Sequence, residues 1–465
     1  MCYTLRMSRR RVCITAILLL VVAVALLATS LLGAQDLAPS PPMGWSEWDA
    51  YGISVTESEF KANATVLSGL REYGWQYALF DAGWYMENPT AANQESKKYV
   101  LDQYGRLTPA VNRFPSAKDG AGFKPLADWL HSQGLKLGIH VMPGVPRQSV
   151  IENLPIAGSR FHALDAADPT QTCSWDSEFY VAKDNKAGQA YYDSIVMLYA
   201  DWGVDYIKLG CVSDHPFHAS GIKQIAMAIK KSGRPIVLSL SPGPPPQPYV
   251  RFAARHAQVW RISEEHWDFW EQQPDNSNHL MGLREAFDLF AKWAPYVKPG
   301  TWADGDLLPV GWLGPRPGWG ESRQSRETED EQRTEFTLWA IARSPLILGA
   351  NLTRLDAFTH SLITNRDIIE INQKAWKSHP LNDLPPGFEH TRVWETYAGT
   401  NDRFRTYVAF FNLDNKPVTL HATWKELGLG GKHAGRSLWD GIPLTPSTVI
   451  EITLPAHGSA IYQVE

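Results

Sequence analysis

The centre of the chain contains the segment Trp202-Gly203-Val204-Asp205-Tyr206-Ile207-Lys208-Leu209-Gly210-Cys211. A helical pattern leads up to it, and Gly203 is a typical helix stop. The apolar run that follows predicts a buried parallel strand, and strand alternation places Lys208 and Gly210 on the same face. We therefore expect this strand to end at a chemical site, with an empty space beside Lys208 because Gly210 has no side chain.

The same unit of a helix followed by a strand recurs on both sides of this segment. Apolar periodicity predicts helices over residues 56–73, 123–132, 187–202, 221–231, 250–256, 283–293 and 329–342, each followed by a short apolar strand. About eight such units are enough for a parallel sheet to close into a (β/α)8 TIM barrel, with polar residues gathered at the C-terminal ends of the strands. A doubly wound open sheet is the alternative, but the chain has no glycine-rich phosphate-binding fingerprint.

The pattern changes beyond residue 385, after Pro385-Pro386-Gly387. Short alternating runs separated by turn residues predict a small antiparallel β domain there. We expect this domain to pack against the barrel, and carbohydrate binding is the alternative role. The predicted organisation is a leader (1–36), a barrel (37–384) and a C-terminal β domain (385–465).

The leader has the features of a targeting signal. Arg9, Arg10 and Arg11 precede an uncharged apolar run over residues 12–33, and Gly33 and Ala34 offer a region for cleavage. We expect a secreted or periplasmic protein. The apolar run is also long enough to span a bilayer, so an uncleaved N-terminal membrane anchor is the alternative.

Composition narrows the class of protein. With 465 residues, 44% of them hydrophobic and 20% charged, the chain can form a large core. A net charge of -5 argues against nucleic acid or an anionic membrane as the main partner. The 19 tryptophans are typical of sugar-binding proteins when they lie beside acidic residues, although each of them could equally fill the core.

Acidic residues follow several of the predicted strands. Paired carboxylates at strand ends are what acid–base chemistry on sugars requires. The sequence shows no serine nucleophile elbow, and its histidines lack metal-ligand spacing, so we expect neither a metal nor a cofactor. The residues concerned are the acidic Asp81, Glu264, Glu265, Asp304 and Asp306 and the histidines His140, His215, His218 and His266.

Several segments, in this order, resemble glycoside hydrolase family 27, which includes α-galactosidases and α-N-acetylgalactosaminidases. They are Pro41-Pro42-Met43-Gly44-Trp45, Leu126-Ala127-Asp128-Trp129, Gly134-Leu135-Lys136-Leu137-Gly138-Ile139, Trp202 to Lys208, Trp260-Arg261, Trp302-Ala303-Asp304-Gly305-Asp306, Leu338-Trp339-Ala340, Ser344-Pro345-Leu346, Thr364-Asn365 and Ile371-Asn372-Gln373. The resemblance implies a retaining (β/α)8 barrel followed by a β-sandwich, and a substrate that is an α-galactoside-like oligosaccharide or polysaccharide.

The resemblance also implies roles for individual residues. Glu265, four residues after Arg261, stands where the family has its acid/base carboxylate. Ala82 stands where a second hydroxyl-binding Asp is usual, and Ser241 stands where α-galactosidases have Glu, as in the α-N-acetylgalactosaminidase branch. The implied substrate-binding residues are Trp48, Asp81, Lys208, Ser241, Arg261, Asp304 and Asp306.

The position of the family nucleophile is the main departure. The family has an Asp two residues after the strand Lys, where this chain has Gly210. Either Asp was replaced by Gly210, or it was deleted and Gly210-Cys211 matches the pair that follows the nucleophile. In the second alignment Cys211 matches a disulfide cysteine whose partner is Cys173, with two free thiols as the alternative. Asp214 is the candidate for a displaced nucleophile, and a surface or capping role is the alternative.

Two functional hypotheses follow. The first is a secreted glycoside hydrolase with Glu265 as acid/base and either Asp214 as nucleophile or a water molecule in the space beside Gly210. The water version would invert configuration, because inversion leaves room for water between the two carboxyl groups. The second is a carbohydrate-binding relative that has lost catalysis, because loss of a nucleophile costs orders of magnitude in rate.

Overall fold

The computed structural model describes residues 37–91, 96–213, 216–272, 280–400 and 403–465. The predicted leader, and with it the signal peptide or anchor, lies outside the described residues, as do Asp214 and His215. Among the described residues, no helix combines the length and apolar character that a membrane crossing requires.

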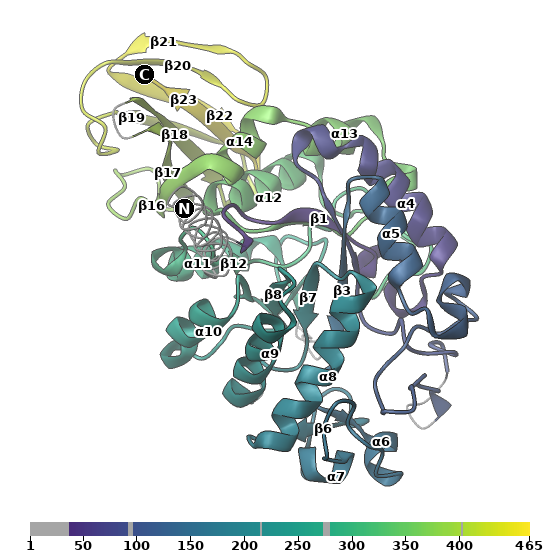
Figure 1. The fold of residues 1–465 in the computed structure, drawn as a ribbon. Coiled ribbons are helices and arrows are strands. Elements are labelled where there is room, and N and C mark those ends of the chain that lie inside the picture. The colour runs from purple at the N-terminus through teal and green to yellow at the C-terminus, as the bar shows by residue number, and fades with distance from the viewer. Residues whose placement is uncertain (1–36, 92–95, 214–215, 273–279, 401–402) are drawn as a thin grey trace, which may run out of the picture.

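A curled parallel sheet of eight strands forms the first domain (Figure 1). Its strands, in spatial order, are β12 (Trp302–Asp304), β9 (Val259–Arg261), β8 (Val237–Leu240), β7 (Tyr206–Leu209), β3 (Lys136–Val141), β2 (Tyr77–Phe80), β1 (Met43–Ser46) and β15 (Leu346–Leu348). Leu308, shortly after β12, forms a parallel bridge with Leu348 of β15. This bridge joins the two edges of the sheet, so the predicted TIM barrel is confirmed.

Seven helices connect the strands and cover the outside of the barrel. They are α4 (Glu57–Gly69), α5 (Lys124–Ser132), α8 (Lys186–Trp202), α9 (Ala219–Ser232), α10 (Val250–His256), α11 (Leu283–Trp293) and α12 (Glu329–Ala342). Each corresponds to a helix that apolar periodicity predicted. Their ends follow local chemistry: Thr328 and Glu331 form a capping box at the start of α12, and Gly203 ends α8 with a left-handed φ of 90°.

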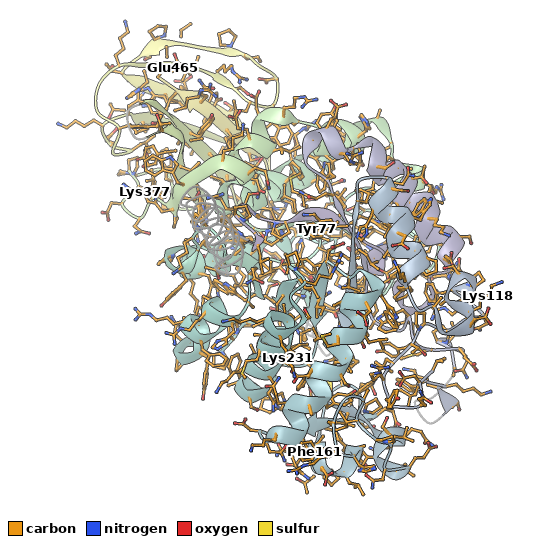
Figure 2. The ribbon with its side chains drawn as sticks, viewed as in Figure 1. Tyr77, Lys118, Phe161, Lys231, Lys377 and Glu465 are labelled. Carbon is orange, nitrogen blue, oxygen red and sulfur yellow. A yellow bond between two sulfur atoms is a disulfide. The ribbon has the colours of Figure 1, made fainter. Side chains whose placement is uncertain are left out.

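Alternation along β7 decides which side chains reach the barrel interior. Ile207 and Leu209 join the large apolar core between sheet and helices, whereas Tyr206 packs with other strand residues in a separate interior cluster. Lys208 therefore faces inward, above Tyr206, and Gly210 follows on the same face. Figure 2 shows Tyr77, a neighbour of Tyr206 in this interior cluster, near the middle of the view, with the exposed Lys118 at the right edge of the molecule.

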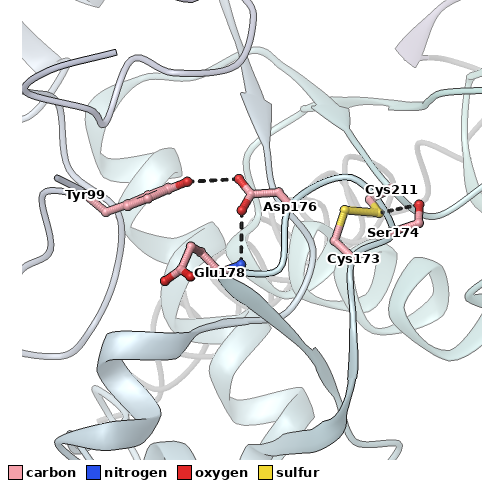
Figure 3. Close-up of a disulfide and its surroundings, with 6 residues drawn as sticks. All are labelled: Tyr99, Cys173, Ser174, Asp176, Glu178 and Cys211. Atoms are coloured by element: carbon pink, nitrogen blue, oxygen red, sulfur yellow. Dashed lines mark hydrogen bonds between the residues drawn. A yellow bond between two sulfur atoms is a disulfide. The ribbon is translucent and has the colours of Figure 1, made fainter. Parts of the chain in front are cut away.

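An excursion between β3 and α8 was not predicted. It contains β4 (Val145–Pro146), α6 (Arg147–Ile151), α7 (Ala163–Ala166), β5 (Ala167–Thr172) and β6 (Phe179–Ala182), with the strands paired in the order β4-β6-β5. Its β5–β6 loop carries Cys173, which forms a disulfide with Cys211 just beyond β7 (Figure 3). The predicted disulfide is confirmed. Asp176 fixes the same loop by accepting hydrogen bonds from Tyr99 Oη and Glu178 N, both at 3.1 Å.

The C-terminal domain is a β-sandwich. A six-stranded sheet contains β16 (Ala375–Pro380), β17 (Thr391–Thr400), β18 (Arg403–Asn412), β23 (Ser459–Val464), β20 (His433–Ser437) and β21 (Pro443–Ser447), and it faces the pair β19 (Val418–Thr423) and β22 (Val449–Leu454). Val408 and Phe410 on one sheet share a core with Leu420 and Ile452 on the other. Because β16 already pairs with β17, this sheet begins at Ala375, before the predicted boundary at 385.

The sandwich packs against the barrel through α12 and α14 (Arg366–Lys374). Thr334 of α12 donates a hydrogen bond to the carbonyl of His457 at 2.7 Å, and Trp439 donates to Thr337 at 3.1 Å. The ring of His457 also stacks on Trp270 with centroids 3.8 Å apart. Packing against the barrel was the predicted role of this domain.

Loss of the disulfide should destabilise the protein. The bond links residues 38 positions apart in the sequence, which on the chain-entropy model stabilises by about 4 kcal/mol. We expect the variant C173A/C211A to lose up to that amount of unfolding free energy, measured by urea denaturation. Thiol titration of the unfolded, unreduced wild type should find neither Cys173 nor Cys211 reactive, and two reactive thiols at these positions would contradict the prediction.

Candidate active site

A cavity of about 510 Å³ opens at the C-terminal ends of the barrel strands. Barrels of this class place their sites at this end, because each strand delivers a side chain to the same space. The sequence-predicted residues that line the cavity are Trp48, Asp81, Lys208, Ser241, Arg261, Glu265 and Asp306. The structure therefore brings together residues from six different strands or the loops that follow them.

An ion pair between Asp81 and Lys208 forms the floor of the cavity. Lys208 Nζ lies 2.6 Å from Asp81 Oδ2, and both side chains are largely buried. The backbone N–H of Asp81 donates to both carboxylate oxygens of Glu47, at 2.8 and 2.9 Å. Asp81 is thus fixed at its side chain and at its backbone, which sets the position of the Lys208 ammonium as well.

The charges in this group are set by burial and by mutual attraction. Burial alone would raise the pKa of Asp81, but Lys208 and His140 outweigh it and lower the pKa to about 2. Burial lowers the pKa of Lys208, but Asp81 and Asp306 raise it above its ordinary value. Burial, and then the charge of Asp81, raise the pKa of Glu47 well above its ordinary range. The group therefore holds an ionised Asp81 and an ionised Lys208 at neutral pH.

Arg261 organises the opposite wall. Its guanidinium is 2% exposed and lies 2.5 Å from Asp306 Oδ2. It also donates to the Ser241 hydroxyl at 3.4 Å and to the carbonyl of Glu264 at 2.9 Å. Arg261, Asp306 and Ser241 thus place several polar atoms on one wall of the cavity. Such a wall suits recognition of a polyhydroxylated ligand.

Glu265 lies between this wall and an aromatic side chain. Its Oε2 accepts a hydrogen bond from Trp267 Nε1 at 3.4 Å. Burial, followed by the negative charge of Asp306, raises the pKa of Glu265, while Arg261 and Lys208 oppose the shift. A raised pKa keeps a larger fraction of the carboxyl protonated, as a general acid requires.

Asp304 differs from the other predicted residues because it is not among those lining the cavity. Its Oδ1 accepts a hydrogen bond from the backbone N–H of Asp306 at 2.9 Å. Burial raises the pKa of Asp304 to about 6. Asp304 thus supports the backbone of Asp306, and the turn interpretation of Asp304-Gly305-Asp306 describes its contacts.

The predicted space beside Lys208 is only partly present, because the cavity adjoins Lys208 but a side chain from the neighbouring strand lies over Gly210. A Cβ added to Gly210 would lie 2.4 Å from His140 Nε2 and 3.4 Å from the ring of Trp175. His140 is the register partner of Lys208 on the neighbouring strand β3, and its ring leans over the end of β7. Sequence alternation identified the face of Gly210 but could not show that a side chain from the next strand fills it.

Three further residues of the site were not recognised from the sequence. Glu47 and Asp49 come directly after β1. Their position after a strand was the sequence signal that could have identified them, since the other polar residues of the site also follow strands. Asp49 lines the cavity with its Oδ2 buried and without a hydrogen-bond partner, and burial and Asp306 raise its pKa well above the ordinary range. Trp175, which is 49% exposed, lines the cavity from the loop fixed by the disulfide.

Family models match two parts of the chain. The model for alpha galactosidase A covers residues 181–374, and the model for the alpha galactosidase C-terminal beta sandwich domain covers residues 391–464. Together they include β7, β8, β9, β12 and β15 of the barrel and most of the C-terminal sandwich.

Known proteins are similar over almost the whole chain. The crystal structure of a β-L-arabinopyranosidase from Geobacillus stearothermophilus superposes with a TM-score of 0.86 at 38% identity and covers 93% of this chain and 98% of its own. A variant of it, in complex with arabinose, gives the same TM-score at 39% identity. The α-galactosidase of Cyamopsis tetragonoloba is 28% identical over 419 residues, covering 88% of this chain and 82% of its own length.

Protonation of His140 should limit stability in acid. Burial, which Asp81 opposes and Lys208 reinforces, lowers the pKa of His140 to about 4, whereas an unfolded His has a pKa of about 6.5. Between these values the unfolded chain binds the proton first, so the stability contributed by the neutral ring is lost as pH falls from about 6.5 to 4. Between pH 7 and pH 5 we expect wild type to lose about 2 kcal/mol more unfolding free energy than His140→Gln.

Urea denaturation at the two pH values measures this difference. The exposed His360→Gln is the control, because it removes a histidine without removing a buried one. Equal pH dependence in wild type and His140→Gln would contradict the assignment of a buried neutral imidazole.

Proposed function

The chain belongs to glycoside hydrolase family 27 and has the architecture of an α-galactosidase-like O-glycosyl hydrolase, and from this premise we propose that it removes terminal α-linked galactose-like residues from oligosaccharides or polysaccharides with Glu265 as proton donor. The observation that carries the proposal is the environment of Glu265. Its carboxyl lines the same cavity as the Asp81–Lys208 pair and Arg261, and its pKa is raised by burial and by Asp306. The sugar hydroxyls would be held by the ion pairs, and the aglycone oxygen would receive the proton of Glu265.

The apolar part of the lining bears on the substrate. Ala82, together with Leu307, presents no polar side-chain atom to the cavity. A β-L-arabinopyranoside has the ring configuration of an α-D-galactopyranoside without the exocyclic hydroxymethyl group. The substitution of Ala82 for a hydroxyl-binding carboxylate therefore supports a site that accepts the pentopyranoside as well as the galactoside.

The nucleophile in this proposal is Asp214. The His140 ring over Gly210 limits the room for an inverting water at this position, and the segment after Gly210 supplies the alternative carboxylate. We propose that Asp214 attacks the anomeric carbon while Glu265 protonates the leaving oxygen, and that water, deprotonated by Glu265, then releases the sugar with retention.

A carbohydrate-binding protein without catalysis is the second candidate function. The observation in its favour is the His140 ring over Gly210, because it occupies the side-chain space at the position where the family resemblance puts the nucleophile. The polar side chains proposed to hold a sugar line the cavity in either case. Hydrolysis of a panel of nitrophenyl glycosides, measured beside glycan binding on the same preparation, separates the two functions.

The proposed site of action is outside the cytoplasm. The apolar leader after three arginines supports secretion or export to the periplasm, and the Cys173–Cys211 disulfide is compatible with an oxidising compartment. An uncleaved leader would instead hold the enzyme at a membrane surface.

The role of Glu265 predicts a dependence on the leaving group. Only a poor leaving group needs protonation of its oxygen in the transition state, so Glu265→Gln should lower kcat/KM for an alkyl or disaccharide substrate by about 10²-fold or more relative to its effect on a dinitrophenyl glycoside. Glu264→Gln is the matched control next to it in sequence and in the cavity lining. Equal losses on both kinds of substrate would indicate a binding role for Glu265 and contradict the proposal.

The role of Asp214 predicts rescue by small anions. Asp214→Gly should lower kcat for an activated α-glycoside by about 10³-fold or more, and added azide or formate should restore part of the turnover and give a glycosyl product of inverted configuration. NMR of the product measures the configuration. Sugar binding in the wild type without any turnover, on all the glycosides of the panel, would instead identify the carbohydrate-binding function.

A further inference from the structure

Three chemically active side chains meet behind the wall of the cavity, at the interface of β10 (Glu265–His266) and α12. They are His266, Glu327 and Glu335, and one ligand atom of each lies within 4.8 Å of the others. His266 directly follows Glu265, Glu327 comes just before the cap of α12, and Glu335 lies within α12. We call this group the His266–Glu327–Glu335 cluster.

The cluster is dry and incompletely paired. His266 is 1% exposed, Glu327 4% and Glu335 0%. His266 Nε2 lies 2.6 Å from Glu335 Oε1, whereas His266 Nδ1 has no hydrogen-bond partner, and the carboxyl of Glu327 can pair only with that of Glu335, by sharing a proton. Unpaired buried carboxylate oxygens cost several kcal/mol in general, so this arrangement requires a proton or a cation to compensate it.

The neighbouring cationic groups are already engaged. Arg323 forms its ion pair with Asp268 at 2.5 Å, and Arg261 pairs with Asp306. The nearby acidic Glu331 has its own partner, because its carboxylate lies 2.6 Å from His457 Nδ1. Within the part of the chain that the structure describes, the only ion-pair contact of the cluster is the one between His266 and Glu335.

We propose that the His266–Glu327–Glu335 cluster binds a divalent metal ion of the zinc or manganese type. One imidazole nitrogen and two carboxylate oxygens are the donor set that such borderline and hard ions share, whereas an all-oxygen set would favour magnesium or calcium. Ligand atoms around a tetrahedral ion bound at about 2.1 Å are about 3.4 Å apart. The ligand atoms of the cluster, which lie within 4.8 Å of one another, would therefore approach one another by up to about 1.4 Å on binding the ion.

The ion would tie the proton donor to the barrel wall. The backbone N–H of His266 donates to Asp306 Oδ2 at 3.0 Å, and the ring of His266 packs on Trp339 of α12. An ion held by His266 and by Glu335 would join the segment that carries Glu265 to α12. Its effect on the proposed reaction is positional, since the proton donor Glu265 is not one of the three ligands.

The alternative to an ion is a shared proton. Burial and the charge of Glu335 raise the pKa of Glu327 well above its ordinary range, so without a cation Glu327 is protonated. The first state contains a bound metal ion and the second contains only a proton, so metal analysis distinguishes them without any assay of activity.

The test uses the purified chain after dialysis against EDTA. We expect isothermal titration with Zn²⁺ or Mn²⁺ to show one site per chain, and a hundredfold excess over Kd to raise Tm by about 3 to 5 °C. Glu327→Gln and Glu335→Gln should each weaken binding by at least about 100-fold. The matched control is Glu331→Gln, which changes a buried Glu of the same helix outside the cluster and should leave stoichiometry and affinity unchanged.

Two results would overturn the proposal. One is wild-type protein that binds neither Zn²⁺ nor Mn²⁺ at a single site, which identifies the cluster as a proton-sharing pair. The other is binding that survives both Glu→Gln substitutions, which places the ion at surface histidines. Circular dichroism of each variant establishes that it is folded before it is titrated.

Discussion

The ion pair between Asp81 and Lys208 is the interaction on which the rest of the site depends. It joins the end of β2 to β7 across β3, and Glu47, after β1, holds the backbone of Asp81 in place. Four adjacent strands of the barrel are thus coupled through one buried charge pair. Removing either partner would leave an uncompensated charge in a dry site, a change that costs about 3–5 kcal/mol in buried pairs generally.

This constraint also explains the state of His140. Its ring lies beside Lys208, and burial together with that cation keeps it neutral. A neutral imidazole packs over Gly210 without adding a second positive charge to the floor of the cavity. The site therefore combines an ionised pair, a neutral ring and carboxyl groups of raised pKa, including those of Glu265 and Asp49, within one cavity.

The sequence predicted the barrel well because its signal is local. Each helix and strand has its own apolar period, and caps such as Thr328 and stops such as Gly203 mark the ends. The excursion that carries β5 and β6 was missed because β5 is largely polar and β6, although apolar, has only four residues, so neither strand has an alternation to detect. The first strand of the six-stranded sheet, β16, lies before the predicted boundary at 385 and begins directly after α14, without the turn residues that separate the other strands.

The site was predicted in its residues but not in its contacts. Strand ends located Asp81, Lys208, Arg261 and Glu265, since position after a strand is a property of the local sequence. The His266–Glu327–Glu335 cluster joins residues about 60 to 70 positions apart and has no spacing that sequence inspection could detect. The filling of the space at Gly210 likewise depends on a neighbouring strand, whose register no local pattern reveals.

The packing of His140 on Gly210 constrains how this chain can change over evolutionary time. A side chain can enter position 210 only after the imidazole has moved or been replaced, because the first added atom would already lie 2.4 Å from the ring. The two positions are therefore coupled: a carboxylate can return to position 210 only together with a turned imidazole or a smaller residue at 140. Reversal thus depends on how freely the His140 ring can turn.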